Sequence, residues 1–186
     1  VVSFGFPHVY DIWLKYLTQF VARYGGTKME RLRDLFDQAV EKCPAEQCKG
    51  LYLMYGKVEE DHGLVRHAMS VYHRAVRAVQ KDDVLEIYKV YVSKASSMVG
   101  VSKMREVLAD AMEVVPGQQI THVSLMYADM ERNLGEVDRA RAIFTYGSQF
   151  ADPRYVYCCR LPNMYLNLRS SFDSLKTQVA SRLLGQ

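Results

Sequence analysis

The sequence has no apolar run approaching the ~20 residues that a membrane-spanning helix needs, so we expect no membrane association. Its first residues show neither the basic start nor the apolar run of a signal peptide, so we expect no secretory leader. It has only four cysteines. Cys158 and Cys159 are adjacent, which makes a poor disulfide framework. These absences favour a reducing compartment, the cytosol or the nucleus.

Motifs of common enzyme classes are also missing, including the P-loop, the nucleophile elbow, the zinc-protease helix and the dinucleotide-binding glycine pattern. The spacing of His62 and His67 does not place both imidazoles on one helix face, as a zinc site would require. Cys43 and Cys48 flank Pro44 with no second pair nearby, so we expect them to be small buried side chains. We therefore predict a protein that is not an enzyme and that holds no cofactor or metal.

The net charge of +3 and the pI of about 8.6 are only mildly basic. A domain that binds nucleic acid usually has a pI above ~9 and a concentrated basic face. We therefore expect any RNA contact to be weak or indirect.

The sequence does contain an internal repeat. "RLRDLFDQA" at residues 31–39 and "RARAIFTYG" at residues 139–147 share one frame, and the intermediate copies lie at steps of 36 residues. The aromatic position of this phrase reads Phe36, Tyr72, Leu108 and Phe144, and the small position reads Ala39, Ala75, Ala111 and Gly147. A second phrase precedes each copy and is anchored on Tyr16, Tyr55, Tyr91 and Tyr127. A fixed period of this length is typical of stacked repeats.

Both phrases have helical spacing, with apolar residues at intervals of three and four, as in Trp13, Tyr16 and Phe20. Glycines separate the two phrases of each copy, at Gly25-Gly26, Gly63, Gly100 and Gly135. Thr27 to Glu30 fits a capping box that opens the second helix of the first copy. The unit is therefore a helical hairpin, which needs neighbouring copies to bury its apolar face.

We predict an all-α fold, an α-solenoid of hairpins with a period of 36 residues in a right-handed superhelix. Residues 1–154 would form the array of about four hairpins, and residues 155–186 a degenerate fifth hairpin or a divergent C-terminal cap. The predicted repeat core comprises Trp13, Tyr16, Phe36, Ala39, Tyr55, Tyr72, Ala75, Tyr91, Leu108, Ala111, Tyr127 and Phe144.

Two surfaces are candidate sites. The residue before each anchor tyrosine from the second hairpin onward is apolar, namely Met54, Val90 and Met126. This first-helix strip is either a groove for a partner's helix or peptide, or packing between neighbouring first helices. Arginines also recur on the second helices, at Arg31, Arg33, Arg66, Arg74, Arg77, Arg105, Arg139 and Arg141. They form either a phosphate-binding stripe or, for most of them, ion pairs with interleaved acids such as Glu59, Glu60, Glu131 and Asp138.

The residues of the repeat resemble those of a known family of helical repeats. The period is close to the 34 residues of a tetratricopeptide repeat, but the second helices look like those of the HAT (half-a-TPR) repeat. The matching residues are Arg33, Phe36 and Ala39, then Ala68, Tyr72, Arg74 and Ala75, then Ala140, Arg141 and Phe144.

A denser resemblance runs from about Phe6 to Arg154, through "FPHVYDIWLKYLTQFVARYGG" and "YADMERNLGEVDRARAIFTYGSQFADPR". These segments resemble the C-terminal half of the HAT-repeat splicing factors of the Syf, or XPA-binding protein, family. The resemblance implies a nuclear scaffold of the spliceosomal NineTeen complex. Its implied partners are the crooked-neck HAT protein, Isy and the Aquarius helicase, with a further link to transcription-coupled DNA repair. The sequence after Arg154 departs from the family's pattern.

Two other functions stay open at this point. One is a module that binds RNA directly through the arginines, and the other is a HAT scaffold of a different RNA-processing machine, such as 3′-end cleavage or ribosome assembly. Steep salt dependence of RNA binding would favour the first.

Overall fold

The computed structural model describes residues 8–150 of the chain. Within this range the backbone is helical, with no strand, so the predicted all-α class is confirmed. The helices are α2 (Tyr10–Tyr24), the short 3-10 turn η1 (Gly25–Lys28), α3 (Met29–Lys42), α4 (Cys48–His62), α5 (Val65–Ala78), α6 (Val84–Met98), α7 (Val101–Val114), α8 (Gly117–Asn133) and α9 (Val137–Ser148). No helix in this part of the chain is long and apolar enough to cross a membrane.

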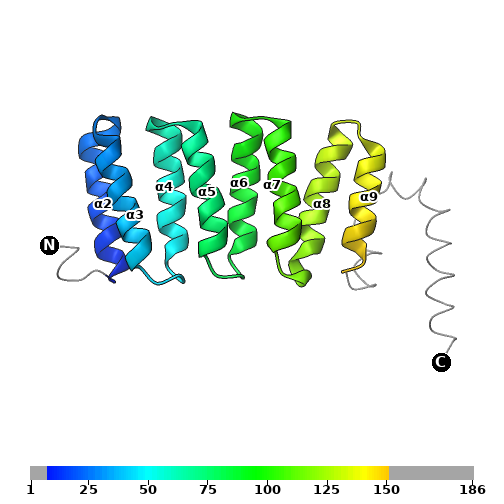
Figure 1. Ribbon diagram of the computed structural model, residues 1–186, viewed down its shortest axis with the longest axis horizontal. Coiled ribbons are helices and arrows are strands. Elements are labelled where there is room, and N and C mark those ends of the chain that lie inside the picture. Colours follow the sequence, from blue (N-terminus) through cyan, green and yellow to red (C-terminus); the bar gives the residue numbers. More distant parts are fainter. Residues whose placement is uncertain (1–7, 151–186) are drawn as a thin grey trace, which may run out of the picture. The chain divides into compact units, whose positions relative to one another are not determined.

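The helices pair into four antiparallel hairpins, α2/α3, α4/α5, α6/α7 and α8/α9 (Figure 1). The second helix of each hairpin packs on the first helix of the next, so that α3 contacts α4, α5 contacts α6 and α7 contacts α8. This is the stacked-hairpin architecture that the period of 36 residues predicts. The right-handed superhelix and the domain limits at residues 154 and 155 stay predictions, and residues 155–186 lie outside the described part.

The hairpins turn at the predicted glycines. Gly100 and Gly135 have φ values of 114° and 85°, in the left-handed region that favours glycine. Gly63 has an ordinary φ, but a Cβ there would lie 2.0 Å from Oε2 of Glu59. The turn of the second hairpin therefore needs glycine for space rather than for backbone conformation.

The predicted capping box at the start of α3 is wrong. Lys28 occupies the N-cap position of this helix and makes no side-chain cap hydrogen bond. The hydroxyl of Thr27 instead donates to the carbonyl oxygen of Tyr24 at 2.5 Å. The reason is that residues 25–28 form a 3-10 turn, which moves Thr27 before the cap position of α3.

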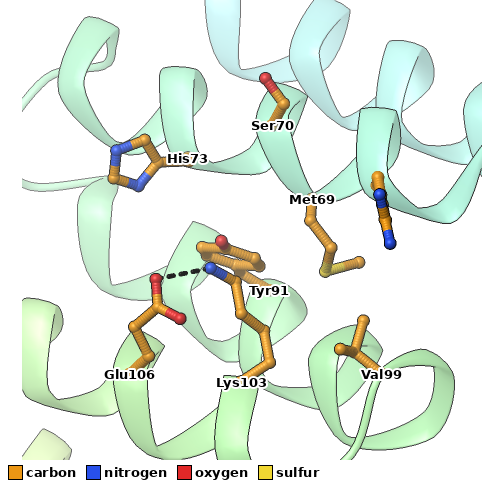
Figure 2. A pocket seen from close by; sticks show the side chains of 8 residues that line it. Met69, Ser70, His73, Tyr91, Val99, Lys103 and Glu106 are labelled. Atoms are coloured by element: carbon orange, nitrogen blue, oxygen red, sulfur yellow. Dashed lines mark hydrogen bonds and ion pairs between the residues drawn. The ribbon is translucent and has the colours of Figure 1, made fainter.

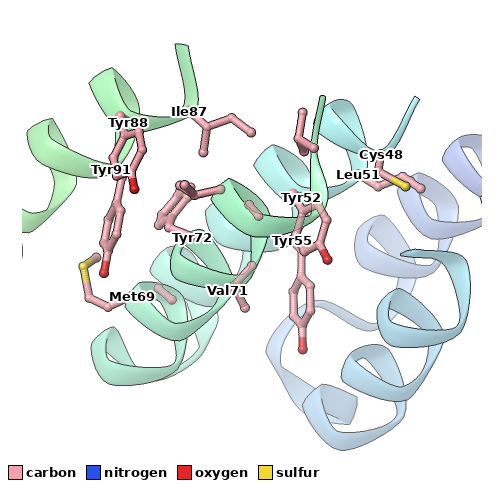
Figure 3. Close-up of a cluster of buried hydrophobic side chains, with 14 of the residues drawn as sticks. Cys48, Leu51, Tyr52, Tyr55, Met69, Val71, Tyr72, Ile87, Tyr88 and Tyr91 are labelled. Atoms are coloured by element: carbon pink, nitrogen blue, oxygen red, sulfur yellow. The ribbon is translucent and has the colours of Figure 1, made fainter. Parts of the chain in front are cut away.

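The hydrophobic core lies along the contacts between hairpins (Figure 3). Phe36 of α3 stacks on Tyr55 of α4, with ring centroids 4.7 Å apart and planes 4° from parallel. Tyr72 of α5 stacks on Tyr91 of α6 with centroids 5.8 Å apart. In these two contacts the ring of the second helix therefore meets the anchor tyrosine of the next hairpin.

The structure places ten of the twelve predicted core residues among the buried side chains, and Tyr127 is half-buried against the same cluster. Tyr16 is a correction, because its side chain is 40% exposed while the adjacent Leu17 is completely buried. Among the described residues, α2 is covered by hairpin neighbours on one side only. Only a narrow stripe of α2, Trp13 and Leu17, is buried there, and Tyr16 lies beside that stripe.

Candidate interaction surface

The first-helix strip lies at the edge of the core. Met54 of α4, Val90 of α6 and Met126 of α8 occupy equivalent places, and each side chain is partly buried. Met54 and Val90 pack against the hydrophobic cluster. This arrangement agrees with the alternative that these side chains pack within the array, and the groove for a partner stays a prediction.

The arginines of the second helices divide into two groups. Four of them form ion pairs, namely Arg33 with Glu59 and Glu30, Arg74 with Asp37, Arg105 with Glu131, and Arg141 with Asp138. Glu60 pairs with Lys94 instead of an arginine. The other four arginines are exposed and have no ion-pair partner among residues 8–150, namely Arg31, Arg66, Arg77 and Arg139. Pairing therefore accounts for half of the arginines rather than for most of them.

Two of the ion pairs are built into the contacts between hairpins. Nε and Nη2 of Arg33 donate to the two carboxylate oxygens of Glu59 at 2.7 and 3.0 Å. Arg105 binds Glu131 in the same two-pronged way, with both distances 2.7 Å. Both glutamate side chains are completely buried. The hydrogen bonds to Glu59 raise the pKa of Arg33, so this guanidinium stays charged.

The contact between α5 and α6 lacks this ion pair. Met69 stands 36 residues after Arg33, and Ala95 stands 36 residues after Glu59. Both of these side chains are buried, Met69 at 5% exposure and Ala95 at 0%. The middle contact therefore has two apolar residues where the contacts on either side have a guanidinium and a carboxylate.

A pocket of about 440 Å³ opens beside Met69 (Figure 2). We name it the α5–α7 pocket. Its lining comes from α5, α6, the third hairpin's turn and α7, and comprises Arg66, Met69, Ser70, His73, Tyr91, Val99, Lys103 and Glu106. Lys103 and Glu106, one turn apart on α7, form an ion pair of 2.7 Å on one wall of the pocket. The pocket thus combines an apolar floor with charged walls.

The sequence interpretation offered ion pairs between these arginines and acids such as Glu59 and Glu131, but it did not assign the individual pairs, and it missed the pocket. A signal for the pairs was present, because Arg33 and Arg105, like Glu59 and Glu131, are separated by twice the repeat period. No comparable signal marked the pocket, since its lining residues come from three helices and a turn and gather only through packing.

The two described cysteines are ordinary buried thiols. Cys43 and Cys48 are both free and buried, and the thiol of Cys48 donates to the carbonyl oxygen of Pro44 at 3.2 Å. Burial raises the pKa of both thiols, which lowers the thiolate fraction that makes a cysteine reactive. Cys158 and Cys159 lie outside the described residues.

Comparison with known proteins identifies relatives of this chain. Residues 1–158 match the family described as "Pre-mRNA-splicing factor Syf1/CRNKL1 C-terminal HAT repeat". The chain is 51% identical over 151 residues to the pre-mRNA-splicing factor syf1 homolog of Drosophila melanogaster, covering 81% of this chain and 17% of that protein. It is 48% identical over 151 residues to SYF1 of Homo sapiens, covering 81% of this chain and 18% of that protein.

The match to SYF1 of Dictyostelium discoideum extends further, with 46% identity over 175 residues, or 94% of this chain and 20% of that protein. The chain thus spans about a fifth or less of the length of these relatives. The matched region includes all four hairpins with their ion-paired and apolar contacts. The chain therefore belongs to the Syf1/CRNKL1 C-terminal HAT-repeat family.

Proposed function

We propose that this chain is a non-catalytic, nuclear protein-interaction scaffold in pre-mRNA splicing. The observation that supports the proposal most is the four-hairpin array that matches the splicing-factor HAT family over residues 1–158. A stack of hairpins offers an extended surface on which several partners dock side by side.

The partners that we propose are proteins of the spliceosomal NineTeen complex, in particular the crooked-neck HAT protein, Isy and the Aquarius helicase. A role in transcription-coupled DNA repair is part of the same proposal. Its support is the resemblance of the sequence to the Syf family together with the relatives' printed name, pre-mRNA-splicing factor.

The test is capture of proteins by the tagged chain from nuclear extract, followed by mass spectrometry. The extract is treated with ribonuclease so that RNA does not bridge the chain to its neighbours. We expect splicing proteins to be enriched. A matched bait, Phe36→Asp, places a carboxylate in the stacked contact with Tyr55 and should lose them as its array unfolds.

Two outcomes would contradict the proposal. Enrichment of 3′-end cleavage or ribosome-assembly proteins alone would assign the scaffold to another machine. Loss of all partners upon ribonuclease treatment would instead favour direct RNA binding, which the four unpaired arginines would then have to explain.

A further inference from the structure

The α5–α7 pocket has an apolar interior that the array itself does not fill. Met69 and Tyr91 form its floor and are buried, at 5% and 2% exposure, whereas Val99 at its mouth is 52% exposed (Figure 2). Its volume of about 440 Å³ falls in the range of ~300–1,000 Å³ that is usual for ligand sites. This space accommodates one or two large side chains of a docked segment rather than a whole helix.

The α5 wall of the pocket carries positive charge. Helix α5 contains Arg66, Arg74 and Arg77 but no aspartate or glutamate. Arg74 is paired with Asp37 of the preceding hairpin, and Arg66 lines the pocket, exposed and without an ion-pair partner among the described residues. A ligand carboxylate near Arg66 would gain a charge-assisted hydrogen bond without breaking one inside the array.

The α7 wall carries a different charge pattern from the α5 wall, and this pattern favours some ligands over others. The cation on this wall, Lys103, is already paired with Glu106. One turn further on, Asp110 accepts a hydrogen bond of 2.8 Å from the hydroxyl of Tyr88. A chain of phosphates running along the pocket would meet the carboxylate of Glu106, and that of Asp110 beyond the lining residues, so the charge pattern disfavours RNA. A ligand with a single carboxylate beside an apolar side chain can bind Arg66 on the α5 wall without extending along the carboxylates of the α7 wall.

We propose that the α5–α7 pocket docks an extended segment of a partner protein in which a large apolar side chain stands next to an aspartate or glutamate. The apolar side chain enters over Met69 and Tyr91, and the carboxylate binds Arg66. This inference rests on the proposed scaffold function, since it names the kind of segment that the scaffold takes.

The test begins with a library of random dodecapeptides displayed on phage, selected against the whole chain. Selected peptides are synthesised with a fluorescent label, and their Kd values are measured by fluorescence anisotropy. Two pocket variants are compared with the parent, Arg66→Glu and Val99→Glu, both at exposed positions that should leave the fold intact. Arg139→Glu on α9 is the matched control, because Arg139 is also exposed and without an ion-pair partner among the described residues but lies outside the pocket.

We expect the selected peptides to share a large apolar residue adjacent to an acidic one. Arg66→Glu and Val99→Glu should each weaken binding at least tenfold, while Arg139→Glu stays within twofold of the parent. A peptide in which the acidic residue is changed to lysine should bind the Arg66→Glu variant but should bind the parent poorly. Circular dichroism melts of all three variants verify that they are folded.

Three results would overturn the inference. They are a selection that yields no shared apolar–acidic pattern, selected peptides that bind Arg66→Glu and Val99→Glu as well as the parent, and a labelled single-stranded U20 RNA that binds the parent and is lost in Arg66→Glu. If one of these three results is obtained and the two variants still capture splicing proteins from extract, the scaffold function stands while the pocket assignment falls.

Discussion

The contact between α3 and α4 and the contact between α5 and α6 use the same backbone arrangement with different chemistry. Both stack an aromatic ring of a second helix on a tyrosine of the next hairpin. Next to this stack, the first contact contains the Arg33–Glu59 ion pair, whose carboxylate is fully buried, whereas the middle contact buries Met69 and Ala95. The comparison shows that both contacts stack rings, and that one array uses an ion pair in one contact and apolar packing in the other at equivalent positions.

The largest expected effect comes from breaking the first contact's ion pair on one side. Arg33→Met leaves the fully buried carboxylate of Glu59 with one ion-pair neighbour in the described part of the chain, His67, whose Nδ1 lies 3.3 Å from Oε1. An unpaired buried charge typically destabilises by ~3–5 kcal/mol, and we expect a loss of that size in urea unfolding at pH 7. Arg31→Met is the matched control, because Arg31 is exposed and has no ion-pair partner among the described residues, so its cost should stay under ~0.5 kcal/mol.

The second prediction converts the first contact into a copy of the middle one. Arg33→Met combined with Glu59→Ala should recover to within about 1–2 kcal/mol of the parent, because apolar replacement of a complete buried pair is often close to neutral. With Glu59→Ala measured alone in the same way, a double-mutant cycle gives the coupling energy. A double variant no more stable than Arg33→Met alone would show that the two contacts are not interchangeable.

The third prediction compares the tyrosine hydroxyls of the two contacts. The hydroxyl of Tyr72 donates to Glu60 at 2.8 Å, whereas the buried hydroxyl of Tyr55 makes no hydrogen bond within residues 8–150. Tyr72→Phe should therefore cost about 1.5 kcal/mol, and Tyr55→Phe should be neutral or slightly stabilising. Thermal melts of the two variants decide, and an equal loss in both would refute the distinction.

The smallest effect concerns alkaline pH. Burial, followed by the hydrogen bond to a carboxylate, raises the pKa of Tyr72 and of Tyr88. Their protonated hydroxyls contribute fully to the free energy of unfolding below the unfolded pKa of ~10. This contribution is lost as the pH rises above that value, because the tyrosines of the unfolded chain lose their protons at a lower pH than those of the folded chain. Ionisation of each tyrosine in the unfolded chain should lower the free energy of unfolding by about 0.8 kcal/mol at pH 10.5. Urea midpoints at pH 8 and 10.5 measure the loss, which should be smaller in Tyr72→Phe.

The sequence predicted the fold well because stacking forces every hairpin to present the same face. Phe36, Tyr72 and Leu108 therefore kept one register, and the turn glycines followed from it. The register was wrong at Tyr16, where the first interval is 39 residues instead of 36 and fewer neighbours cover the helix. The α5–α7 pocket could not be predicted from the sequence. Met69 has the pattern of a core residue, and the residues that face it across the pocket are known only from the structure.

The alternation of ionic and apolar contacts also bears on how the array assembles. Hairpins of similar sequence are prone to pair with the wrong neighbour while a repeat protein folds. If α3 docked on α6 instead of α4, the guanidinium of Arg33 would face Ala95 and be buried without a carboxylate. If α5 docked on α8, the carboxylate of Glu131 would face Met69. Each of these slips by one hairpin therefore leaves a charge unpaired in the contact, which disfavours the wrong neighbour.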